Sequence, residues 1–194
     1  MQYGRQAGAM LLVGIDEVGR GAWAGPLVVG AVSLGKRPRG LADSKQLAKA
    51  KRAELAEKIL ASATFVGIGW ADNEEIDAFG LSTAINLAIR RAIRRLDFEA
   101  EIIIDGNVNY LFDRPGSKCI VKADEKLAEV MAASIIAKVA RDNFMLSQAG
   151  EFPDFGFDSN VGYGTRLHSE ALKRHGATRW HRLSYQPVMD IANG

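Results

Sequence analysis

Short apolar runs that end at acidic residues or glycine alternate along this chain with stretches in which apolar residues recur at helical spacing. The run over residues 27–34 is rich in β-branched residues, and a glycine-rich turn connects it to the run before it. Both features are typical of β-strands. The strands that this pattern predicts are Leu11–Asp16, Leu27–Leu34, Thr64–Ala71, Glu101–Asp105 and Lys118–Val121.

Helical spacing predicts four helices, over residues 43–62, 82–96, 124–144 and 167–175. The third has the clearest buried ridge, with an apolar residue at every fourth position: Leu127, Met131, Ile135 and Val139. Asp43 followed by Gln46 resembles the cap that opens the first helix. Strands mixed with helices predict an α/β fold, a mixed sheet flanked by helices.

The composition changes near residue 150, where Gly, aromatic, His and Arg residues become frequent. We therefore expect two parts: residues 1–149 as an α/β domain, and residues 150–194 as a small C-terminal helical appendage packed on it.

The composition is that of a globular protein, with 47% apolar and 25% charged residues in 194. The longest charge-free run, Gly21–Gly35, is too short and too interrupted by Gly and Pro for a membrane helix. Residues 7–15 weakly resemble a signal-peptide core, but Asp16, Glu17 and Arg20 follow directly. The single cysteine, Cys119, cannot form an intrachain disulfide. We expect a cytoplasmic protein without membrane contact.

The net charge of +2 does not by itself indicate a nucleic-acid partner, but the basic residues are clustered. Residues 36–58 hold eight Lys and Arg against three acids, residues 90–95 hold four Arg, and the chain after Asn160 holds five Lys and Arg with all three His. Such clusters could follow a phosphate backbone or could be the solvated faces of helices.

Acidic residues at the ends of predicted strands are the strongest functional indication. Asp16 and Glu17 end the first strand, Asp105 ends the fourth, and Asp124 lies where the long helix begins. Ligands of α/β sheets bind in the crevice outside strand ends, where these carboxylates could converge. Grouped carboxylates repel one another unless divalent cations neutralise them, and oxygen ligands suit Mg²⁺ or Mn²⁺. Taken singly, Asp105 could only form a turn and Asp124 could only complement a helix dipole.

Asp142 is a rival for the fourth carboxylate. On one straight helix it would lie roughly 27 Å from Asp124, so both cannot reach one metal pair. We expect Asp142 to form a structural ion pair with the neighbouring Arg141. The three His are expected to be structural or to face phosphate, because no Cys partner or zinc spacing accompanies them.

Residues 19–24 fit the dinucleotide-binding pattern G-x-G-x-x-A, but Gly25, Pro26 and a second strand follow where that motif needs a helix. A nicotinamide or flavin enzyme is therefore disfavoured. A glycine turn beside acidic residues instead lets the backbone approach a ligand closely.

In combination, these segments resemble one family, ribonuclease HII, the type 2 ribonuclease H. The matching segments, in order, are Gly14–Gly21 with Ala24–Pro26, Asp43–Leu47, Ile104–Gly106, Lys122–Asp124, Ala133–Asp142, Gly162–Thr165 with His168, and His181–Tyr185. The resemblance spans residues 11 to about 187.

The resemblance implies a ribonuclease H-like fold and a metal-dependent endonuclease. It would cleave the RNA strand of RNA/DNA hybrids and cut 5′ of single ribonucleotides in duplex DNA, leaving 3′-hydroxyl and 5′-phosphate ends. By position, two divalent ions, Mg²⁺ or Mn²⁺, would be held by four catalytic carboxylates: Asp16, Glu17, Asp105 and Asp124. The residues implied in substrate binding are Gly19, Arg20 and Gly21 at the ribose 2′-hydroxyl, Tyr163 at the RNA-to-DNA junction, and Lys45 at a phosphate.

Three alternatives remain open at this point. Ribonuclease HIII has a similar core but carries an added N-terminal domain, for which the ten residues before the first strand leave no room. A recombination or transposition nuclease would lack the Gly-Arg-Gly and Tyr163 combination, and a non-catalytic nucleic-acid-binding module would not need the four acids. We also expect a monomer, and residues 188–194 lack the paired aromatic residues of a sliding-clamp motif.

Overall fold

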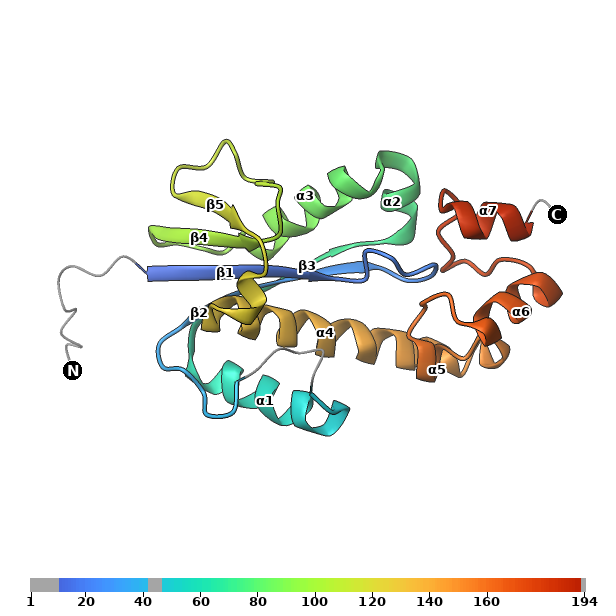
Figure 1. Cartoon of the computed structure of the whole chain (residues 1–194), viewed down its shortest axis with the longest axis horizontal. Helices are drawn as coiled ribbons and strands as arrows, with labels where there is room; N and C mark the ends of the chain where they lie inside the picture. The colour runs from blue at the N-terminus through green and yellow to red at the C-terminus, as the bar shows by residue number, and fades with distance from the viewer. Residues whose placement is uncertain (1–10, 42–46, 193–194) are drawn as a thin grey trace.

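The computed structural model describes residues 11–41 and 47–192, and a mixed sheet of five strands forms its centre (Figure 1). The strands are β1 (Leu11–Val18), β2 (Leu27–Leu34), β3 (Ala63–Ala71), β4 (Ala100–Asp105) and β5 (Ser117–Ile120). Their order across the sheet is β3-β2-β1-β4-β5. The pairs β1–β2 and β2–β3 are antiparallel, whereas β1–β4 and β4–β5 are parallel. The predicted mixed five-stranded sheet is confirmed.

Helices cover both faces of this sheet (Figure 1). They are α1 (Lys49–Ser62), α2 (Asn73–Phe79), α3 (Leu81–Ala92), α4 (Ala128–Ala149), α5 (Phe157–Asn160), α6 (Arg166–His175) and α7 (Gln186–Ala192), with short 3₁₀ turns η2 (Ala123–Glu125) and η3 (Pro153–Phe155). One apolar core lies between α3 and the sheet, and a second lies between the sheet, α1 and α4. The α/β architecture follows from strands whose apolar side chains point to both faces.

Helix α4 lies unusually close to the sheet. A Cβ atom on Gly30 of β2 would come within 2.2 Å of the Ala133 carbonyl oxygen of α4, so only glycine fits there. This close approach places the next residue of the helix, Ser134, beside Asp16 of the neighbouring strand β1.

The predicted helix over residues 124–144 is wrong at its start. Lys122 has a left-handed backbone (φ 58°), η2 follows, and α4 begins only at Ala128. Asp124 therefore lies on a separate turn before the helix. Helix α1 begins at Lys49 rather than at residue 43, and the predicted cap at Asp43 lies outside the described residues, as does Lys45.

The C-terminal segments form the predicted helical appendage, at the end of the molecule beyond the carboxyl end of β1 (Figure 1). Their apolar side chains, including Phe157 and Leu172, pack in a third core with Ala24 and Met145 from the preceding part of the chain. The division at residue 149 stays a prediction. Among the described residues, no helix has the length and apolar character that crossing a membrane requires.

Candidate active site

The ends of two adjacent parallel strands place Asp16 beside Asp105. Ile15 of β1 is in register with Ile104 of β4, so the residues that follow them are neighbours across the strand pair. Adjacent strands lie about 4.8 Å apart, and neighbouring residues in register point to the same face. The two carboxylates are close enough for Asp105 to raise the pKa of Asp16.

Asp16 is a buried carboxyl group, 6% exposed, beneath α4. Its pKa is raised to about 8, first by burial and then by the charge of Glu17, while a hydrogen bond from Ser134 and one from the Glu17 amide (2.8 Å) oppose the shift. Such a carboxyl group ionises fully near neutral pH only when a cation comes close.

Glu17 is the next residue of β1, which ends at Val18, and its carboxylate accepts a hydrogen bond from Arg20 Nη1 at 3.1 Å. Burial raises the pKa of Glu17, Arg20 lowers it, and Asp105 raises it again. Glu17 and Asp16 therefore share their electrostatic environment with Asp105.

A turn before α4 brings Asp124 towards Asp105. Asp105 Oδ1 accepts a hydrogen bond from the Ala123 amide at 2.7 Å, and Asp124 is the next residue, 5% exposed. Arg20 thus holds the Glu17 carboxylate, and the Ala123 amide holds that of Asp105. Within residues 11–41 and 47–192, no three His, Cys, Asp or Glu side chains are arranged as a metal site, so the proposed ligand set stays a prediction.

The loop between β1 and β2 is fixed by two arginines. Gly19 has a positive φ of 99°, and a Cβ atom there would lie 2.3 Å from Arg141 Nε. The Arg20 carbonyl accepts hydrogen bonds from Arg182 Nη1 (3.0 Å) and from the Tyr185 hydroxyl. Gly21 faces open space, because an added Cβ would meet no atom within 4 Å. The loop is thus rigid on its inner side and accessible on its outer side.

Arg141 also brings Tyr163 to this loop. Arg141 Nη1 donates to the Val161 carbonyl at 2.8 Å, and the guanidinium carbon lies 5.3 Å from the centre of the Tyr163 ring. The Trp23 and Ala24 amides both donate to the Gly162 carbonyl, at 2.8 and 3.1 Å. Residues about 140 positions apart in the sequence therefore form one surface.

Arg141 and Arg182 hold the backbone around this site, a role that the sequence did not predict. Both are completely buried, and Arg182 donates twice to the Gly25 carbonyl, at 3.0 and 2.9 Å. Burial lowers the pKa of both, to about 10 for Arg141. Nothing in a sequence indicates that an arginine will bind backbone carbonyls. Ser134 could have been noticed, as a polar residue in the apolar stretch of α4.

The expected pair of Asp142 with Arg141 is wrong. Asp142 instead binds Lys138 one helical turn earlier, at 2.8 Å, and Arg52 of α1 at 3.8 Å. The Arg141 side chain instead donates to the loop carbonyls of Pro26 and Ala24. Asp142 is nevertheless a structural ion-pairing residue, as predicted.

The three histidines have different positions. His168 and His181 are buried with their Nε2 atoms 2.9 Å apart, which confirms their structural role and excludes the phosphate-facing one. His175 is exposed at the end of α6. The expectation that residues 19–24 do not form a dinucleotide-binding turn is confirmed, because they lead into β2.

Known proteins share the fold of this chain. The mixed sheet, with helices on both faces, is a ribonuclease H-like fold. A crystal structure of ribonuclease H2 from Pyrococcus horikoshii OT3 superposes with a TM-score of 0.78 at 25% identity, covering 95% of this chain and 98% of that one. The family model of Ribonuclease HII matches residues 13–188, and the chain therefore belongs to the ribonuclease HII family.

Ribonuclease HII of Streptomyces avermitilis is 44% identical over 181 residues, 92% of this chain and 78% of that protein. This chain is thus a ribonuclease H, an endonuclease of a family that needs divalent metal, and the non-catalytic alternative is set aside. The manganese complex of Bst-RNase HIII shares the fold, with a TM-score of 0.73 at 23% identity, but covers 97% of this chain and 71% of that one. The family match favours type HII over type HIII.

One relative bears on partners. The RNase HII of Archaeoglobus fulgidus, solved as a complex with PCNA, has a TM-score of 0.77 at 29% identity, covering 91% of this chain and 96% of that one. The prediction that a sliding-clamp interaction is not evident is therefore not supported.

Proposed function

We propose that this protein cleaves the RNA strand of RNA/DNA hybrids and cuts duplex DNA 5′ of single embedded ribonucleotides, leaving 3′-hydroxyl and 5′-phosphate ends. Its four catalytic carboxylates would hold two divalent ions, Mg²⁺ or Mn²⁺: Asp16, Glu17, Asp105 and Asp124. The observation that carries this proposal is the register of β1 and β4, which sets the buried Asp16 beside Asp105.

The chemistry of these side chains fits hard divalent cations. All four candidates supply carboxylate oxygens. Burial, and then the charges of Glu17 and Asp105, raise the pKa of Asp16, so a bound cation would favour its ionised form. When bound, two such ions supply the charge that lowers the pKa of an attacking water and stabilises the departing 3′ oxygen. The serine hydroxyl of Ser134 would keep the Asp16 carboxylate oriented during this step.

The loop Gly19–Gly21 is assigned to the ribose 2′-hydroxyl, the group that separates RNA from DNA. Its backbone is held from within by Arg141 and Arg182, and Gly21 leaves room for a sugar to approach. Glycine at both ends and a fixed Arg20 carbonyl make the loop a preorganised backbone site.

Tyr163 is assigned to the deoxyribose on the 3′ side of the ribonucleotide. Its ring is half-buried over the Arg141 guanidinium, and its carbonyl accepts a hydrogen bond from His168 Nδ1 at 3.0 Å. An aromatic ring held in this way can pack on a sugar that lacks the 2′-hydroxyl. Lys45, outside the described residues, remains a proposed phosphate contact, and residues 150–194 a proposed substrate-binding extension.

A cleavage assay tests this function. Four matched duplexes are compared in Mg²⁺ and in Mn²⁺: all-DNA, DNA with one ribonucleotide, an RNA/DNA hybrid, and a strand with an RNA-to-DNA junction. We expect incision 5′ of the single ribonucleotide and none of the all-DNA duplex. Incision 3′ of the ribonucleotide, or activity confined to the hybrid, would contradict the proposal.

A further inference from the structure

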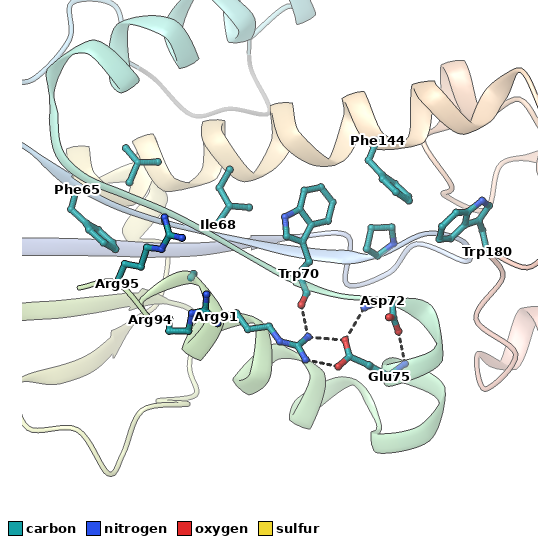
Figure 2. A pocket seen from close by; sticks show the side chains of 14 residues that line it. Phe65, Ile68, Trp70, Asp72, Glu75, Arg91, Arg94, Arg95, Phe144 and Trp180 are labelled. Atoms are coloured by element: carbon teal, nitrogen blue, oxygen red, sulfur yellow. Dashed lines mark hydrogen bonds and ion pairs between the residues drawn. The ribbon is translucent and has the colours of Figure 1, made fainter. Parts of the chain in front are cut away.

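A groove of about 850 Å³ follows the outer edge of β3 (Figure 2). None of the four candidate carboxylates lines it. Its floor is the strand segment 65–70, one side is formed by residues at the end of α3, and the other by side chains from α4 and the C-terminal segment. We refer to it as the β3-edge groove.

One edge of β3 has no strand beside it within the described residues. There β3 is the first strand of the sheet and pairs with β2 alone. Arg91 Nη1 donates to the Trp70 carbonyl at 2.6 Å, so this carbonyl points away from β2. Because these groups alternate along a strand, Val66 and Ile68 also direct their N–H and C=O groups outward. No Lys, Pro or charged residue interrupts the nine residues of β3, although exposed edges usually carry one.

The two sides of the groove have different chemistry. On the α4 side, the rings of Trp70 and Phe144 lie 5.8 Å apart, those of Phe144 and Trp180 lie 5.0 Å apart, and Ile68 is 39% exposed. On the α3 side lie three arginines, Arg91, Arg94 and Arg95 (Figure 2). A strand laid along this edge would therefore meet apolar surface on one face and positive charge on the other.

The positive charge on the α3 side is only partly neutralised. Arg91 forms a two-bond ion pair with Glu75, at 2.7 and 2.6 Å. Arg94 and Arg95 are exposed and have no ion pair within the described part of the chain. An occupant that complements them carries negative charge.

We propose that the β3-edge groove binds an extended peptide segment of a partner protein, which adds a sixth strand to the sheet beside β3. Side chains of an added strand alternate between its two faces. The segment therefore alternates aromatic or large aliphatic residues, which contact Ile68, Trp70 and Phe144, with Asp or Glu, which contact Arg94 and Arg95. Single-stranded nucleic acid could use the rings and the arginines, but it would leave the outward N–H groups of β3 unpaired.

A designed peptide tests this directly, by fluorescence anisotropy with the full chain. The probe has eight residues that alternate Phe or Leu with Asp or Glu. Two further versions carry N-methyl groups, one on the apolar and one on the acidic residues. Only alternate amides of an added strand face its neighbour, so one version should bind like the parent and the other about tenfold or more weaker.

Charge reversal provides the second measurement. The double variant Arg94→Glu/Arg95→Glu should lower affinity for the parent peptide about tenfold or more. The control Lys173→Glu/Arg174→Glu changes the net charge equally, at two exposed adjacent cations of α6, and should leave peptide affinity unchanged. Thermal unfolding of both variants verifies that they fold.

Four results would overturn the proposal. The first is no binding at millimolar peptide, and the second is equal binding of both N-methylated versions. The third is that an eight-nucleotide single-stranded nucleic acid binds in place of the peptide, and that Arg94→Glu/Arg95→Glu abolishes its binding. The fourth is a dimer in sedimentation that Arg94→Glu/Arg95→Glu dissociates, because the groove would then bind a second copy of this chain.

Discussion

Asp105 has two neighbours, the Asp16 carboxylate and the Ala123 amide, and the substitution Asp105→Asn affects them differently. In Asp105→Asn, the side-chain oxygen can still accept the Ala123 hydrogen bond, but the negative charge is gone. Losing an outer-shell partner costs about 10- to 100-fold in activity, so losing a direct ligand should cost more than about a hundredfold. We expect cleavage to fall by at least that factor while duplex binding and the melting temperature are kept.

Asp113→Asn is the matched control for this variant. Asp113 is an exposed acid in the loop that follows β4, and it pairs with Arg90 at 2.8 Å. Its substitution should leave cleavage near the wild-type rate. Near-normal activity of Asp105→Asn at saturating Mg²⁺ would remove Asp105 from the ligand set.

Tyr163 is the residue whose substitution separates positioning from metal binding. Tyr163→Ala should lose most activity on a single embedded ribonucleotide, about a hundredfold, because the sugar is no longer positioned. Tyr163→Phe should retain more, since the proposed contact uses the ring and not the hydroxyl. The measurement is kcat/KM on junction and all-RNA hybrid strands, together with the Mg²⁺ dependence, which should be unchanged. Full junction activity in Tyr163→Ala would show that the assignment is wrong.

The contacts of some residues can be predicted from the sequence and those of others cannot, because their partners differ in kind. The proximity of Asp16, Glu17 and Asp105 could be predicted because they follow apolar runs, and strand ends meet at one edge of a sheet. Arg141 and Arg182 could not, because they bind backbone carbonyls, which every residue possesses. Asp142 was correctly predicted to form an ion pair, but Lys138 at i−4 was overlooked in favour of the adjacent Arg141, which a helix directs elsewhere.

At the scale of elements, α6 and the following loop are joined by two histidines in defined protonation states. The Tyr163 carbonyl can only accept, so His168 Nδ1 carries a proton and His168 Nε2 accepts from His181 Nε2. His181 Nδ1 then accepts from the Thr178 amide at 2.8 Å. A further proton on either ring would place two donors face to face.

This arrangement predicts a pH-dependent loss of stability. Burial lowers the pKa of His168, and burial with the neighbouring His168 lowers that of His181 to about 4. A folded pKa below the unfolded value of about 6.5 means that stability falls as the pH drops from about 6.5 towards 4, by up to about 1.4 kcal/mol per pH unit per proton. We expect the unfolding free energy of wild type to approach that of His181→Gln between pH 7 and pH 5 in denaturant titrations.

His175→Gln is the control for a surface histidine. Its contact with Asp154 at 3.7 Å is exposed and contributes little, so its difference from wild type should change much less than that of His181→Gln. Asp16 acts in the opposite direction, because its raised pKa favours the folded state as the pH falls below about 8, and the comparison with a variant cancels this contribution. A constant difference between wild type and His181→Gln would show that the pair does not stay neutral.

Helices and strands can be predicted from the sequence where their apolar pattern is long and depends only on neighbouring residues. All five strands and the buried ridge of α4 follow from apolar periodicity. The start of α4 does not, because the left-handed backbone of Lys122 depends on where β5 delivers the chain. Helix α2 was missed although Asp72 and Glu75 form a capping box, since its seven residues are too few for periodicity.

At the scale of the whole molecule, the basic clusters should make duplex binding depend on salt. Four exposed cations of the 36–58 cluster have no ion pair within the described residues: Lys36, Arg37, Arg39 and Lys49. If all four contact phosphates, the slope of log affinity against log salt is about −3 to −4. We expect Arg37→Gln/Arg39→Gln to reduce the slope by about 2, whatever the duplex sequence.

Lys58→Gln serves as the control, because Lys58 is already paired with Glu54 at 2.5 Å and should contribute little. A slope near zero for wild type would mean that the cluster is only a solvated helix face. Three cations of that cluster that a sequence count includes, Lys51, Arg52 and Lys58, prove to be engaged with acids of the chain itself.

The two buried arginines have a consequence during protein synthesis, because the loop that they hold is made long before them. The loop Gly19–Pro26 leaves the ribosome early, yet the side chains that hold its carbonyls belong to residues 141, 182 and 185, near the other end of the chain. During translation, strand β1 and its acids therefore exist for more than a hundred residues of synthesis without the contacts that fix the neighbouring loop. A chain that ends before Arg182 contains all five strands and still lacks side chains that hold this loop. We therefore expect nuclease activity only once synthesis has passed Tyr185.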